Sequence, residues 1–94
     1  MKFVKNKTNR GFNLLQFYDD NNQLCDIQQS SSMEPHIWLG THDTNPKILK
    51  KGKGWIDYKI PENVLISNRM HLNRKQSITL AFKLLKYGLI GKLK

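Results

Sequence analysis

The chain has a single cysteine, Cys25, so no disulfide can form within it. This cysteine usage is typical of a reducing compartment, where a thiol serves as a small core residue. No stretch approaches the roughly 20 apolar residues that a membrane-spanning helix needs. The lysine-rich start has no apolar run of the kind found in a signal peptide. We therefore expect a soluble protein that stays in the cytoplasm.

The sequence is also short and poor in apolar residues, with 94 residues of which 38% are hydrophobic. A chain of this length forms one domain and buries only about 60–65% of its unfolded surface. A thin core of this kind is often completed by a bound partner or by a second copy. The composition therefore predicts a homodimer somewhat more readily than a monomer.

Acidic residues are scarce and confined to part of the chain. The formal net charge is +9, yet residues 11–46 contain five acids and no lysine or arginine. Residues 1–10 and 63–94 contain cations and no acid. Charge segregation of this kind has three interpretations. The basic segments can form a surface that attracts phosphates or an acidic protein, or they can pair with the acidic segment of another copy. They can also serve only to keep the protein soluble.

The first half of the chain predicts strands. Residues 1–11 are polar and basic, and we expect a flexible lead-in. Phe12–Tyr18 and Gln23–Gln29 are apolar and aromatic runs separated by Asp19-Asp20-Asn21-Asn22, a turn sequence. Further strands are predicted at His36–Leu39, at Trp55–Ile60, which alternates, and at 64–66.

One helix is predicted near the end. Asn73 is a good N-cap, and Gln76 stands in the capping-box position three residues later. Ile78, Ala81, Phe82 and Leu85 then recur at helical spacing, and Gly88 is a natural stop. The prediction is an α+β domain over residues 12–94, with a small antiparallel sheet of four to five strands and one C-terminal helix packed on it.

Catalytic and metal sites have little support in the sequence. His36 and His42 are six residues apart, outside the spacing of metal-ligand pairs, and no Cys-x-x-Cys is present. No nucleophile-elbow sequence surrounds a serine, and Cys25 in a hairpin strand is typical of a core residue. We expect no metal, no cofactor and no enzymatic activity. Turnover of a nucleotide remains a minority alternative.

Two basic segments are candidate anion sites. Lysines, glycines and a tryptophan follow one another in residues 50–55, a combination of flexible backbone, cations and a ring that can stack on a base. Residues 69–75, at the predicted helix start, form the second. Trp38, flanked by Ile37 and Leu39, is a stacking residue, an interface residue or a core residue. The candidate ligand-binding residues are Trp38, Lys50, Lys51, Lys53, Trp55, Arg69, His71, Arg74 and Lys75.

Several short motifs occur together in this chain. They are Ile27-Gln28-Gln29-Ser30-Ser31, Ile37-Trp38-Leu39-Gly40, Gly54-Trp55 and Arg69-Met70-His71-Leu72-Asn73-Arg74-Lys75-Gln76. From about Gly11 onward the chain resembles a widespread family of small proteins encoded by bacterial viruses. It departs from that pattern at Lys75, where the family usually has an acid, and in its more basic helix.

The resemblance implies a viral accessory protein, and such proteins often bind and disable host defence. We therefore expect a counter-defence protein, an anti-CRISPR or another immune-evasion inhibitor, that acts by binding. Its partner is an anionic ligand, either a nucleotide signal or nucleic acid, or else a host defence protein. The alternative is a general DNA- or RNA-binding protein of viral replication, whose affinity falls steeply with salt.

Overall fold

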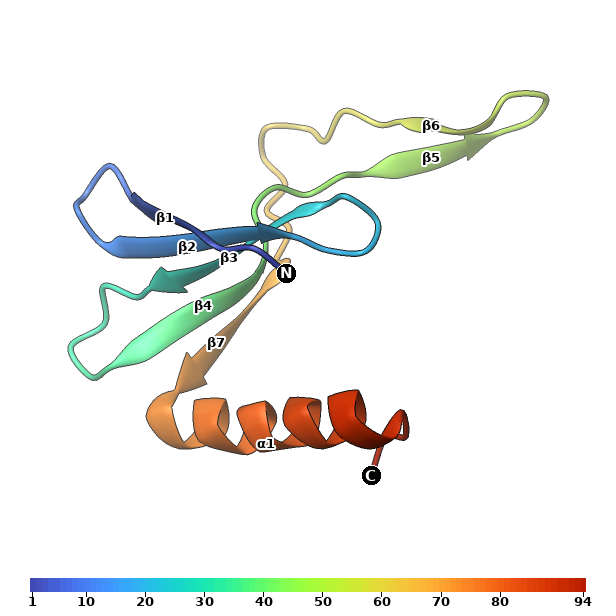
Figure 1. Cartoon of the computed structure of the whole chain (residues 1–94). Helices are drawn as coiled ribbons and strands as arrows, with labels where there is room; N and C mark the ends of the chain where they lie inside the picture. The colour runs from blue at the N-terminus through green and yellow to red at the C-terminus, as the bar shows by residue number, and fades with distance from the viewer.

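The computed structural model describes residues 1–94 and is an α+β protein. Five strands form an antiparallel sheet in the order β1-β2-β3-β4-β7, and β5 and β6 form a separate two-stranded hairpin (Figure 1). The predicted α+β fold, with an antiparallel sheet of four to five strands and a C-terminal helix, is confirmed. The elements are β1 (Val4–Lys7), β2 (Asn13–Tyr18), β3 (Leu24–Gln29), β4 (His36–Thr41), β5 (Lys47–Lys50), β6 (Gly54–Asp57), β7 (Arg69–Asn73) and α1 (Arg74–Ile90).

The β2–β3 hairpin forms where the sequence predicted it. One carboxylate oxygen of Asp19 accepts hydrogen bonds from the backbone N–H groups of Asn21 and Gln23, each at 2.9 Å. Asn22 adopts the left-handed backbone conformation, with φ of 62°. Asn tolerates that conformation better than most residues, which is why this polar tetrapeptide turns the chain.

The lead-in expected at residues 1–11 contains a strand. β1 pairs with β2 along its whole length, from Val4 opposite Gln16 to Lys7 opposite Asn13. The ring of Phe3 meets that of Phe17 edge to face, with centroids 5.2 Å apart. Backbone pairing does not depend on apolar side chains, so a lysine-rich segment can still extend the sheet at its edge.

The last strand of the sheet lies later in the sequence than expected. Residues 64–66 form no strand, and β7 instead comprises Arg69–Asn73, directly before the helix. β7 approaches β4 closely at Gly40: a Cβ there would lie 2.5 Å from the carbonyl oxygen of Asn68 and 2.9 Å from Cα of Arg69. The glycine of the Trp-Leu-Gly motif therefore permits the β4–β7 contact.

Helix α1 begins as predicted and ends three residues later than expected. Asn73 is the N-cap, and its side chain and that of Gln76 form the reciprocal capping box. The helix continues through Gly88 and ends at Ile90, where Gly91 adopts the left-handed conformation with φ of 71°. Gly91 therefore takes the role that was expected of Gly88.

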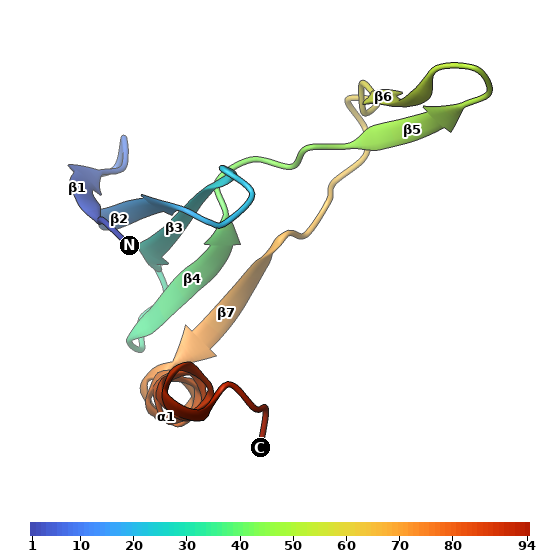
Figure 2. The same cartoon turned by 45° about the vertical axis from the view of Figure 1, so that its right-hand side comes forward.

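The helix begins at the end of β7 and extends across the direction of that edge strand (Figures 1 and 2). Ile78, Phe82 and Leu85, expected to pack on the sheet, are 57%, 67% and 57% exposed. Leu14 and Cys25 are the only buried hydrophobic residues. The radius of gyration is 16.3 Å, against about 12 Å for a compact chain of this length. The single chain is thus an open structure. No helix in it has the length and apolar character needed to span a membrane.

Candidate functional site

The strand register gives the main sheet one apolar face and one polar face. Leu15, Ile27, Leu39 and Met70 lie opposite one another across four strands and belong to the apolar face. The alternate positions form the other face, because successive side chains of a strand point to opposite sides. That face includes the buried Leu14, opposite Gln28. We call its other members the polar face, and they are Gln16, Asp26, Gln28, Trp38, Arg69 and His71.

Trp38 belongs to a group of three stacked rings on the polar face, in which His71 lies between Trp38 and His36. The centroid of its ring is 4.1 Å from that of His71 on the neighbouring strand, with the ring planes 31° apart. His71 in turn stacks on His36, with centroids 4.5 Å apart and planes 12° apart. The guanidinium carbon of Arg69 is 5.7 Å from the centroid of Trp38, within cation–π distance. Two of the predicted residues, Arg69 and His71, therefore meet Trp38.

A fully buried carboxylate lies next to this group. Asp26 has no exposed surface, and its Oδ2 accepts a hydrogen bond from Nδ1 of His42 at 2.6 Å. Its Oδ1 has no hydrogen-bond partner but lies 3.6 Å from a guanidinium nitrogen of Arg69. The same nitrogen donates to Oε1 of Gln28 at 2.9 Å. Asp26 and Gln28 thus hold the guanidinium beside Trp38, because a buried carboxylate needs a positive partner.

An open hollow of about 540 Å³ adjoins Trp38. Its volume is in the range of roughly 300–1,000 Å³ that is usual for small-molecule sites. Lys7 and Arg10 supply positive charge at its wall, Trp38 and Phe12 supply rings, and no acidic residue lines it. The lining residues are Lys7, Thr8, Asn9, Arg10, Phe12, Leu14, Gln28, Gln29, Ser31, Trp38 and His42. We call this hollow, with the adjoining ring group and Arg69, the Trp38 site.

The other predicted residues lie elsewhere. Lys50, Lys51, Lys53 and Trp55 belong to the β5–β6 hairpin, which projects from the sheet on the side opposite α1 (Figures 1 and 2). Arg74 and Lys75 open α1, and Arg74 lines a second hollow of about 620 Å³ together with His36 and Met33. The nine predicted residues therefore occupy three places. The start of α1 adjoins the ring group through His36, whereas the β5–β6 hairpin is separate.

Sequence reasoning missed the residues that complete the Trp38 site. Asp26, His42 and Gln28 were not selected, nor were Lys7 and Arg10, which were assigned to a flexible segment. One signal for Asp26 was present, since an acid stands between apolar residues in a predicted strand. A charged residue at such a position is rarely left without a partner.

The thiol of Cys25 is held in its protonated form. Removal from water raises its pKa, and the carboxylates of Asp19 and Asp26 raise it further. A nucleophilic cysteine needs the opposite shift. No three His, Cys, Asp or Glu side chains gather closely enough to hold a metal ion.

Comparison of the chain with protein-family models, with curated proteins and with solved structures gives no match.

Proposed function

We propose that the protein binds, without converting it, a small anionic ligand that contains a flat ring, such as a nucleotide, at the Trp38 site. The observation that carries this proposal is that Trp38 lies beside Arg69 and also lines a hollow. The only charged residues lining that hollow, other than histidine, are Lys7 and Arg10. A nucleotide combines the two chemistries that these residues recognise, a π-face and a phosphate.

The contributions of the two chemistries differ. Stacking of a base on an aromatic side chain is worth about 1–3 kcal/mol and depends little on which base it is. The phosphate contacts with Lys7 and Arg10 add affinity that weakens as salt is raised, because both side chains are exposed. Arg69 is already held by Asp26 and Gln28. Little side-chain entropy is then lost when a ligand binds there.

Two features support binding rather than catalysis, a buried thiol on the apolar face of the sheet and the ring contacts of the Trp38 site. The raised pKa of the Cys25 thiol disfavours a nucleophilic thiolate. At the Trp38 site, His71 is hydrogen-bonded to Ser30 at 2.9 Å and stacked between two rings. These contacts fix the rings in place, as expected of residues that shape a binding surface.

The biological role that fits such a binder is counter-defence in the cytoplasm of a bacterial host. A viral protein that captures a nucleotide signal removes it from the host pathway that responds to it. This proposal rests on the Trp38 site together with the resemblance to small viral proteins. Direct docking on a host defence protein through the same basic surface is the alternative within this class.

We also propose that the functional form is a homodimer that covers α1. Ile78, Phe82, Leu85 and Leu89 form an apolar stripe along the helix, and the last of these is 77% exposed. With two buried hydrophobic residues, the single chain has too small a core to offset the entropy of folding. A second copy is the partner that is always present, and a two-fold contact places the same stripe on both sides of the interface.

Native mass spectrometry tests the ligand proposal. The protein is incubated with a small-molecule extract of bacterial cells, desalted, and measured beside the Trp38→Ala variant. The proposal predicts a mass increase that corresponds to a nucleotide in the wild type and its loss in the variant. A wild-type protein that remains free of ligand under these conditions contradicts it.

A further inference from the structure

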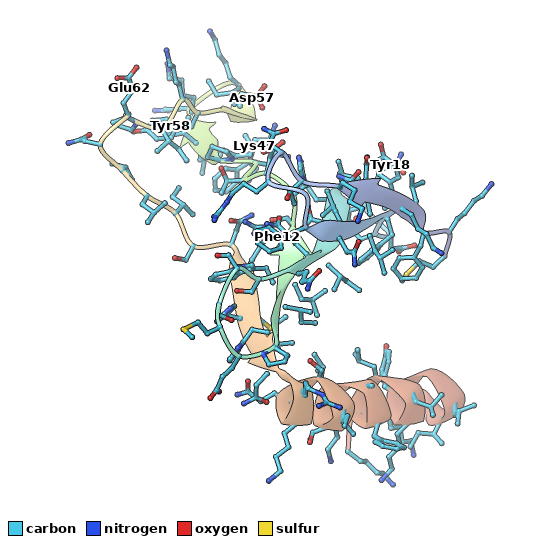
Figure 3. The ribbon with its side chains drawn as sticks, turned by 90° about the vertical axis from the view of Figure 1, so that its left-hand side faces the viewer. Phe12, Tyr18, Lys47, Asp57, Tyr58 and Glu62 are labelled. Atoms are coloured by element: carbon cyan, nitrogen blue, oxygen red, sulfur yellow. The ribbon has the colours of Figure 1, made fainter.

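The β5–β6 hairpin forms a free-standing arm. We call residues 47–57 the basic arm: β5, the tip at 51–53 and β6. Its strands pair only with each other, from Lys47 opposite Asp57 to Lys50 opposite Gly54. Figure 3 labels Lys47, Asp57 and the adjoining Tyr58 on this part of the chain. An isolated two-stranded hairpin is marginally stable in water, so an arm of this kind is expected to gain order from a partner.

The arm presents positive charge at its tip. Lys47 is paired with Asp57, the only acid of the arm, which leaves Lys50, Lys51 and Lys53 without an acidic neighbour on it. All three are exposed. Gly52 and Gly54 adopt positive φ, 80° and 72°, so the tip is a tight turn that places these lysines close together.

One face of the arm adds apolar surface beside that charge. Leu49 lies directly opposite Trp55, so the two side chains share a face. They are 61% and 68% exposed, and no ring of the main sheet stacks on Trp55. The arm therefore combines a cationic tip with an exposed tryptophan, which is typical of a binding surface.

The acids of a second copy do not offer a matching surface. Asp26 is buried against His42, and one oxygen of Asp19 accepts two backbone hydrogen bonds in its own turn. The remaining acids of residues 11–46 lie in loops at both ends of the strands, and they are Asp20, Glu34 and Asp43. A polyanion with regularly spaced charges fits three clustered lysines better than these scattered carboxylates.

We propose that the basic arm binds duplex DNA, as a two-stranded ribbon in the major groove. That groove is about 12 Å wide and admits a two-stranded β-ribbon, whose strands are about 4.8 Å apart. Lys50, Lys51 and Lys53 contact phosphates along the groove, and Leu49 with Trp55 contacts base edges such as the thymine methyl group. The deep, narrow major groove of duplex RNA does not admit the same ribbon. This second site is independent of the Trp38 site.

The test compares two triple variants that remove the same charge from the full-length protein. In the arm variant Lys50, Lys51 and Lys53 are changed to Ala; in the control, Lys86, Lys92 and Lys94 near the end of α1 are changed to Ala. Binding of a fluorescent 20-base-pair DNA duplex is followed by anisotropy at several salt concentrations. Each lost phosphate contact lowers the magnitude of the slope of log K against log [salt] by about 0.9. The slope of the arm variant should therefore be smaller in magnitude than that of the wild type by about 2.7.

The control should keep most of the wild-type steepness, and a duplex RNA of equal length should bind more weakly than the DNA. The Trp38→Ala variant should bind DNA like the wild type, because the arm is a separate site. The proposal is overturned if the wild type does not bind the duplex, or if the arm and control variants have equal affinity and salt dependence. It is also overturned if the arm variant changes the oligomeric state of the protein but not its affinity for DNA. The arm is then a contact between copies of the chain.

Discussion

Nδ1 of His42 lies 2.6 Å from Oδ2 of Asp26, the most deeply buried residue of the chain. The other oxygen of the same carboxylate faces the guanidinium of Arg69 at 3.6 Å. Asp26 in β3 thus contacts both His42, which follows β4, and Arg69, which begins β7. Because Arg69 lies beside Trp38, the carboxylate contributes to the stability of the sheet and to the order of the Trp38 site together.

The Asp26→Asn variant should be less stable than the wild type. The amide keeps the size of the side chain but removes the charge that faces Arg69 and presents an N–H₂ group where acceptors are needed. Mismatched buried polar groups cost about 1–3 kcal/mol. Chemical denaturation followed by circular dichroism measures the loss. Asp43→Asn, which changes an exposed acid in the loop after β4, should have little effect, and equal stabilities of the two variants would contradict the role given to Asp26.

The Gly40→Ala variant should weaken the contact between β4 and β7. Its Cβ would lie 2.5 Å from the carbonyl oxygen of Asn68, which is backbone and moves only with the strand. Overpacking of this kind costs about 1–3 kcal/mol. Gly88→Ala is the matched control, because a Cβ in that helical position meets nothing within 4 Å and alanine favours a helix over glycine by about 0.5–1 kcal/mol. The melting temperature should fall for the first variant and rise for the second.

The stability of the protein should decrease at alkaline pH because of Cys25. The pKa of its thiol is raised in the folded chain, mainly by burial, above the ordinary value of 9.0 that applies to the unfolded chain. As pH rises, the thiol therefore ionises first in the unfolded state, which favours unfolding. The contribution of the protonated thiol to stability is complete below about pH 8 and is lost as pH rises through the folded pKa. Denaturation midpoints at neutral pH and at about pH 9.5 measure this decrease. The Cys25→Ala variant should show a smaller decrease, and an equal one would exclude the thiol as the cause.

The Leu85→Ser variant should shift the protein from dimer to monomer. Leu85 belongs to the exposed apolar stripe of α1, and a buried leucine at an interface contributes about 1.5–3 kcal/mol. Light scattering coupled to size-exclusion chromatography gives the mass at several protein concentrations. Leu93→Ser removes an equally apolar side chain beyond the helix, 84% exposed, and should leave the mass unchanged. A wild-type protein that is monomeric throughout would contradict the dimer.

The local elements of the fold were predictable where a few neighbouring residues determine them. The turn at Asp19–Asn22 and the capping box of Asn73 and Gln76 are recognised from adjacent side chains, and both are present in the structure. β7 was not expected, because Met70 and Leu72 alone give too short an alternation. β1 was missed because its stability comes from backbone pairing with β2 and not from its own lysine-rich sequence.

The Trp38 site was only partly predictable for a similar reason. Trp38, Arg69 and His71 were selected from motifs, but their contact depends on the register between β4 and β7, strands that are about 30 residues apart in the chain. Local sequence patterns do not determine such a register. The lysines of the basic arm, which were also selected as ligand-binding residues, lie away from the site on a separate hairpin.

Fluorescence of Trp38 tests the central claim most directly. In the Trp55→Phe variant Trp38 is the only tryptophan, since the chain has two. Purine and pyrimidine nucleoside phosphates are added one at a time, and the emission is recorded as a function of concentration. The proposed function predicts that at least one of them changes the emission with saturation, and that the change is lost when Arg69→Ala is added to the same background. An emission that no nucleotide alters, or that responds equally without Arg69, would contradict a nucleotide site at Trp38.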